Sequence, residues 1–157
     1  MDRRVAALIL SLLAASVPSP LAAGCGGGDG QDEYRQEYRK LDRQLVRLGD
    51  DVGETIAAAP QTPDTDLARK LGELAERTGD LEDDLDGLDP PGDLESEHER
   101  LVQAVGSAQG ALERLGRAVS TGSRQGAGEA TVTLVEASRE LLEAQRAIRR
   151  VLASEPG

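Results

Sequence analysis

The stretch LESEHERLVQAVGSAQGALERLGRAV, residues 94–119, decides the fold class of this chain. One set of positions recurs at alternating intervals of four and three residues, and charged or polar residues fill most positions between them. The set is Leu94, His98, Leu101, Val105, Ala108, Leu112, Leu115 and Val119. In a helix with 3.6 residues per turn, these intervals place the side chains on one face. The stretch therefore predicts an amphipathic helix that buries this face.

Three further segments have the same spacing. They are Tyr34, Tyr38, Leu41, Leu45, Leu48, Val52, Ile56 and Ala59; Leu67, Leu71, Leu74, Thr78, Leu81, Leu85 and Leu88; and Ala130, Leu134, Ala137, Leu141, Ala144, Ile148 and Val151 or Leu152. Prolines 60 and 63, the turn residues 87–92 and the segment 121–128 separate the four segments, because proline and glycine interrupt helices.

These boundaries predict helices over residues 32–59, 65–87, 94–120 and 129–154. Asp64 or Thr65 is expected to cap the second helix, and Asp93 the third, because their side chains can accept from the first free N–H groups. Short connections favour antiparallel neighbours, so we expect an all-α, up-down-up-down four-helix bundle. The same spacing also suits a two-stranded coiled coil. Four apolar helix faces in one chain can bury one another without a second chain, which favours the monomeric bundle.

The N-terminus has the pattern of an export signal. Arg3 and Arg4 precede an apolar run from Val5 to Val17, which suits a signal peptide and is short for a spanning helix of about 20 residues. The sequence Leu21-Ala22-Ala23-Gly24-Cys25 follows and resembles the lipobox of bacterial lipoproteins.

That resemblance implies a lipid anchor. A transferase would attach diacylglycerol to the Cys25 thiol, and a signal peptidase would recognise Leu21, Ala22, Ala23 and Gly24 and cleave before Cys25. Cys25 is the only cysteine, so the exported domain can form no internal disulfide. We therefore expect residues 1–24 to be a cleaved signal peptide, 25–31 a flexible Gly-rich tether, and 32–157 the bundle, at the extracytoplasmic face of the cell membrane. An ordinary cleaved signal peptide that contains a cysteine is the alternative.

The lipobox, the glycine-rich segment and the charged heptad helices together resemble small helical lipoproteins of high-GC Gram-positive bacteria. The segment Leu88-Asp89-Pro90-Pro91, followed by Leu94, His98 and Leu101, is similar to one that recurs among them. These proteins mostly have no assigned function, so the resemblance implies no catalytic residues.

Composition excludes several classes of ligand. The net charge is −11 and becomes −12 once residues 1–24 are removed, which argues against nucleic acid. Tyr34 and Tyr38 are the only aromatic residues, so the chain has little to stack against sugars or nucleobases. We expect no cofactor.

His98, the only histidine, lies on the apolar stripe. With Glu95 it forms Glu-x-x-His, half of the motif pair in di-iron bundles, but a second histidine is missing, and that site is rejected. A single metal ligand or a pH-sensitive group stays open. The favoured interpretation is a histidine near the end of the bundle with a partly hydrated ring.

Residues 80–99 contain ten acidic residues and no lysine or arginine. Glu82, Asp84, Asp86 and Gly87, with Asp93 at the twelfth position, partly resemble an EF-hand loop. Glutamate at its first position and aspartate at its last depart from that pattern. A hydrated acidic hairpin is therefore favoured, and these four acidic residues are weak metal-ligand candidates only.

The sequence favours a non-enzymatic, membrane-tethered interaction or scaffold module of the cell envelope, bound to an envelope protein of unknown identity. The alternative is an ion- or ligand-responsive accessory protein that uses the acidic segment and His98. In an up-down bundle tethered at its N-terminus, that segment and the C-terminal arginines would lie at the membrane end. Segments 60–64 and 121–128 would then point away from it.

Overall fold

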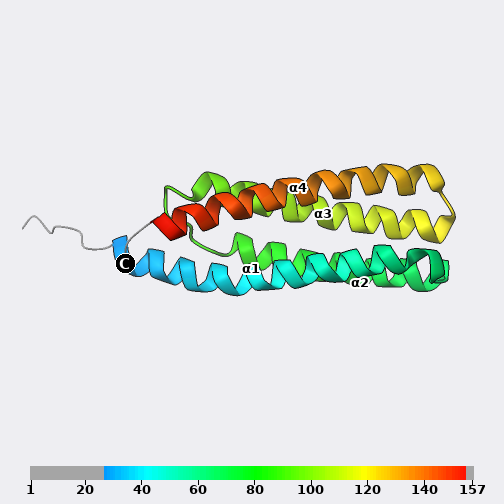
Figure 1. Cartoon of the computed structure of the whole chain (residues 1–157), viewed down its shortest axis with the longest axis horizontal. Coiled ribbons are helices and arrows are strands. Elements are labelled where there is room, and N and C mark those ends of the chain that lie inside the picture. Colours follow the sequence, from blue (N-terminus) through cyan, green and yellow to red (C-terminus); the bar gives the residue numbers. More distant parts are fainter. Residues whose placement is uncertain (1–26, 155–157) are drawn as a thin grey trace, which may run out of the picture.

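The computed structural model describes residues 27–154, which form a bundle of four helices. They are α1 (Gly27–Ala58), α2 (Asp64–Asp86), α3 (Glu95–Thr121) and α4 (Arg124–Ser154), with a 3₁₀ turn η1 (Ala59–Gln61) after α1. Successive helices run antiparallel along the same axis (Figure 1). No strand occurs in the described part of the chain. The predicted all-α, up-down-up-down bundle is confirmed.

The predicted stripes form the core. Leu71, Leu85, Leu101 and Val105 are fully buried, and alanines of α3 and α4 fill the spaces between the larger side chains. The stripe of α1 is buried only as far as Leu48. Further along α1, Val52 is half-buried and Ile56 is 39% exposed, so the second half of this helix is incompletely covered.

The start of α1 differs from the prediction. The helix begins at Gly27 and not at residue 32, so residues 27–31 of the predicted tether belong to α1 in the structure. Glycine weakens a helix, but extension of an existing helix needs no new nucleus, and the added turn continues α1 directly. The remaining tether residues, Cys25 and Gly26, lie outside the described residues.

The connection between α3 and α4 is shorter than the predicted loop over 121–128. Gly122 has φ 68°, in the left-handed region that glycine adopts without steric cost. Its N–H donates to the Val119 carbonyl at 3.2 Å, and the Ser123 N–H donates to the Ala118 carbonyl at 2.9 Å. These are the paired bonds of a Schellman turn. The Ser123 hydroxyl then accepts from the N–H of Gly126 at 3.2 Å, and α4 starts at once.

The predicted caps of α2 and α3 are wrong. Neither helix has a side-chain hydrogen bond at its N-cap, where Pro63 and Leu94 stand. Asp64 lies inside the first turn of α2, where its negative charge interacts favourably with the positive end of the helix dipole. Asp93 lies in the turn before α3, where the Leu94 N–H donates to the Pro91 carbonyl at 2.8 Å.

The connections alternate between the two ends of the bundle. The start of α1, the α2–α3 connection and the end of α4 share one end, at the left of Figure 1, whereas η1 and the α3–α4 turn share the other. The connections therefore alternate as expected for an up-down-up-down bundle. Within residues 27–154, no helix has the length and apolarity needed to cross a bilayer.

Two glycine substitutions test the α3–α4 turn. Gly122→Ala should lower the free energy of unfolding by about 1 kcal/mol, because alanine pays a steric cost at positive φ. Gly128→Ala should raise it by a similar amount, about 1 kcal/mol, because Gly128 is helical and a Cβ there meets open space. Urea denaturation followed by circular dichroism measures both, and equal effects of the same sign would contradict the turn.

Candidate binding groove between α1 and α4

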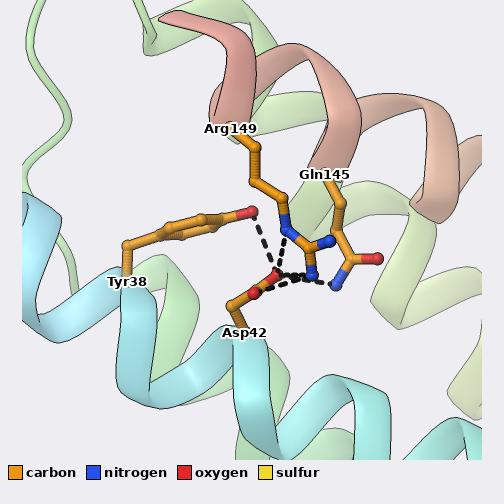
Figure 2. Close-up of polar contacts among 4 residues, drawn as sticks. All are labelled: Tyr38, Asp42, Gln145 and Arg149. Carbon is orange, nitrogen blue, oxygen red and sulfur yellow. Dashed lines mark hydrogen bonds and ion pairs between the residues drawn. The ribbon is translucent and has the colours of Figure 1, made fainter. Parts of the chain in front are cut away.

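A polar cluster joins α1 to α4 near the end of the bundle where α1 begins and α4 ends. Asp42 on α1 is its centre, and Figure 2 shows Arg149 and Gln145 of α4 converging on the Asp42 carboxylate. The Arg149 Nη2 donates to both carboxylate oxygens, at 2.8 and 2.7 Å, and its Nε donates at 3.2 Å. The Gln145 amide donates at 3.1 Å. We call Tyr38, Asp42, Gln145 and Arg149 the Asp42 clamp.

The clamp is partly shielded from water. The Asp42 side chain is 16% exposed, whereas that of Arg149 is 50% exposed. Hydrogen bonding to Asp42 raises the pKa of the Arg149 guanidinium. Burial raises the pKa of Tyr38, whose neutral hydroxyl donates to Asp42 at 3.5 Å. The clamp therefore fixes Asp42 opposite residues 145–149 of the antiparallel helix.

Beyond the clamp, the seam between α1 and α4 opens. The backbones of these two helices stay farther apart than those of the other neighbouring pairs. A cavity of about 350 Å³ lies in the seam. Leucine and valine side chains of α1 and α4 form its sides, and α2 and α3 supply its floor. Residues that line it include Leu45, Leu48, Val52, Leu134, Leu141 and Leu142, with Thr78, Val105 and Leu112 below.

The mouth of this groove is unusually apolar. Every exposed large hydrophobic side chain in the described residues is on α1 or α4: Val46, Ile56, Val132, Val135 and Leu142. Gly49 and Gly53 also line the groove, and a Cβ at either position would meet no atom within 4 Å. The groove thus combines large exposed side chains on α4 with empty glycine positions on α1.

Sequence reasoning missed this groove, although a signal was present. A second set of small and apolar residues follows the same three-and-four spacing beside each main stripe. The members are Val46, Gly49 and Gly53 on α1, and Thr131, Val135, Ser138 and Leu142 on α4. A helix with two adjacent apolar stripes exposes one of them when only one is buried.

His98 is buried, and the prediction of a partly hydrated ring is wrong. Its side chain is only 5% exposed. The Tyr34 hydroxyl donates to Nδ1 at 3.0 Å, and Nε2 donates to the Leu85 carbonyl at 3.0 Å, because a carbonyl can only accept. Both ring nitrogens are therefore engaged, which leaves none free to bind a metal or to act as a base. Burial lowers the pKa of His98 below its ordinary value.

The acidic segment does not form the loop that an EF-hand needs. Glu82, Asp84 and Asp86 lie within α2, where residues two apart point to opposite faces. Buried Leu81 and Leu85 hold this part of α2 in helical register. Between residues 27 and 154, no group of three or more histidine, cysteine, aspartate or glutamate residues is placed to hold a metal ion.

The lipobox prediction concerns Leu21, Ala22, Ala23, Gly24 and Cys25, which lie outside the described residues. Comparison with known proteins adds no further assignment. The chain matches no protein-family model, no curated protein and no solved structure.

The Asp42 clamp can be tested by removing one charge. Asp42→Asn should lower the free energy of unfolding by about 1–3 kcal/mol, because the amide cannot accept from Arg149 at both positions and leaves a guanidinium unpaired. Asp50→Asn is the matched control, since Asp50 is exposed and makes no hydrogen bond or ion pair with the described residues. Urea denaturation compares the two, and an equal loss in both would contradict the clamp.

His98 should make stability depend on pH. Its folded-state pKa is depressed, so the protein binds this proton less readily when folded than when unfolded. The free energy of unfolding is then largest above the unfolded-state pKa of about 6.5 and falls as the pH drops below it, by at most about 1.4 kcal/mol per pH unit.

His98→Gln provides the comparison, because glutamine does not titrate and His98 is the only histidine. Urea midpoints measured at pH 7.5, 6.5 and 5.5 should decline more steeply for the native chain than for this variant. Parallel pH profiles would show that His98 is not buried as the neutral ring.

Proposed function

We propose that this chain is an exported lipoprotein, held at the extracytoplasmic face of the cell membrane by acylated Cys25, with a bundle that acts as a non-enzymatic interaction module of the cell envelope. The observation that carries the interaction role is the gathering of all exposed large hydrophobic side chains of the described residues on α1 and α4. Apolar surface that the bundle does not bury itself is typical of a binding site.

The arrangement of the helix ends supports a tether at one end. Cys25 precedes the first residue of α1 by two positions, so acyl chains on it would lie at the end that α1 and α4 share. Two or more acyl chains give stable attachment, where one chain is marginal. Along α1, Ile56 lies about 44 Å from Gly27 at 1.5 Å per residue.

A protein partner would find its binding surface at the far end. Ile56 on α1, with Val132 and Val135 on α4, forms what we call the outer patch; these side chains are 39%, 58% and 64% exposed. Ile56 and Val135 line the same stretch of groove, and Val132 lies one turn earlier on α4 than Val135. This surface would project away from the lipid headgroups and toward other envelope proteins.

The alternative role for the acidic segment 80–99 as an ion-responsive site has less support. Its first three candidate ligands are on a continuous helix, and His98 is hydrogen-bonded inside the core. An enzymatic role also finds little support, since the single histidine has no free ring nitrogen to serve as a general base.

In-cell crosslinking with affinity capture tests the proposal. The native chain should fractionate with membranes and capture one dominant envelope protein, whereas Cys25→Ala should lose both properties. Val135→Glu should keep the membrane attachment and lose the partner. Binding would remove water from the new carboxylate in the outer patch, and burying an unpaired charge is unfavourable.

Ser107→Glu is the matched control, since Ser107 is exposed on α3, outside the groove. It should behave like the native chain. Membrane retention of Cys25→Ala would contradict the anchor. Equal capture by Val135→Glu and Ser107→Glu would contradict the outer patch.

A further inference from the structure

We propose that the cavity between α1 and α4 binds a long-chain fatty acid, with its aliphatic chain inside the cavity and its carboxylate at Arg146. This binding goes beyond the proposed function and does not depend on the outer patch or on a protein partner. Four features of the cavity lead to it: its volume, the chemistry of its walls, its place along the seam between two helices, and the charge beside one end of its mouth.

The volume suits a chain of moderate length. Ligand cavities range from about 300 to 1,000 Å³, and the cavity of about 350 Å³ falls in that range. A cavity of about 150 Å³ holds benzene, which has six carbons. At the same volume per carbon, the cavity of about 350 Å³ would hold a chain of roughly 14 carbons.

The walls offer contacts to an aliphatic chain and little else. Apart from exposed Asp50, the polar side chains among the lining residues already have partners within the bundle. The Thr78 hydroxyl donates to the Leu74 carbonyl at 2.7 Å, and the Ser138 hydroxyl donates to the Leu134 carbonyl at 2.7 Å. The Gln145 amide nitrogen donates to Asp42. No aromatic residue lines the cavity, so nothing in it would select a planar ligand by stacking.

The size of the cavity favours a chain over a helix. The floor consists of Val105 and Leu112 on α3, beneath both α1 and α4. At the near end, the clamp holds these two helices together through contacts of 2.7–3.2 Å. A helix is about 10 Å across and would rest on the mouth, whereas a chain of methylene groups can lie lengthwise between the leucine and valine side chains of α1 and α4.

Charge at the mouth orients the ligand. Arg146 follows Gln145 on α4 and lines the stretch of groove that adjoins the cavity, and it makes no hydrogen bond or ion pair with any described residue. Arg139, further along, is already paired with Glu143 at 3.1 Å. Asp50 stands two turns beyond Asp42 and would repel a carboxylate there. A guanidinium binds a carboxylate through two parallel hydrogen bonds, which places the head group at Arg146.

The source of the fatty acid is the surroundings and not the protein's own anchor. The cavity begins at Leu45, about 27 Å along α1 from Gly27. An acyl chain spans one leaflet, about 15 Å, or half of the hydrocarbon core. Acyl chains on Cys25 therefore stop short of the cavity if they begin at the end of the bundle.

Equilibrium dialysis against radiolabelled palmitate, below its aggregation concentration, tests the proposal. The protein is the bundle, residues 26–157, because residues 27–154 contain the whole core described above. We expect saturable binding of one palmitate per chain. Octanoate should bind far more weakly, because it buries fewer methylene groups.

Two glycine variants test the place of binding. Gly49→Leu directs a leucine into the groove and should weaken palmitate binding at least tenfold, whereas Gly72→Leu on α2 should leave it unchanged. At both positions a Cβ meets open space, and leucine favours the helix more than glycine does, so both variants should fold. Circular dichroism checks this directly.

Two arginine variants test the carboxylate position. Arg146→Gln should weaken palmitate binding about fivefold, as expected for loss of one exposed charge pair of about 1 kcal/mol. Arg150→Gln, on α4 but outside the groove, should leave it unchanged. Hexadecanol should bind equally to the native chain and to Arg146→Gln.

Three results would overturn the proposal. The first is absence of saturable palmitate binding. The second is equal binding by Gly49→Leu and Gly72→Leu, or equal binding by Arg146→Gln and Arg150→Gln. The third is concentration-dependent dimerisation in sedimentation velocity that palmitate does not alter and Gly49→Leu abolishes, which would identify a second copy as the occupant. None of these results bears on membrane attachment or on the outer patch.

Discussion

The contact of Asp42 with Arg149 and Gln145 determines how the first helix lies against the last. The other neighbouring helices pack mainly through leucine and alanine side chains, with the His98 hydrogen bonds and an Arg77–Asp51 ion pair as their polar contacts. A carboxylate held by a guanidinium and an amide across the seam tolerates little displacement, because its partners must meet it at 2.7–3.2 Å. The clamp closes the seam at the end where α1 begins and α4 ends. It also fixes the position of α1 relative to α4 along the bundle axis.

An open seam follows from the residues beyond the clamp. The main stripe of α1 ends in half-buried Val52 and exposed Ile56, and glycines occupy two positions that face the groove. With small residues at these positions, the seam between α1 and α4 can close only if the two helix backbones approach each other. The clamp does not bring the two backbones that close. The result is a cavity with a buried apolar floor and an apolar mouth, the combination that ligand sites commonly show.

Much of the fold was predictable from the sequence, and much of the site was not. The spacing of Leu94, Leu101 and Val105 predicts a buried helical face, because periodicity reports which residues share a face. It does not report how closely two helices approach, so the cavity could not be predicted from the main stripes. The burial of His98 was also missed, because its partners Tyr34 and Leu85 come from two other helices. The α3–α4 loop was overestimated, since a single glycine at positive φ reverses the chain.

The central claim is that an apolar cavity, accessible to small ligands, lies between α1 and α4 beyond the Asp42 clamp. Methyl NMR under xenon pressure tests this directly, because xenon enters empty apolar cavities. The account predicts saturable shifts for the methyl groups of Leu45, Leu112 and Leu134, which line the cavity, and none for Leu81 or Leu101 in the closed core. Uniform small shifts across all leucines, or no saturation, would mean that the seam is closed in solution and would contradict the account.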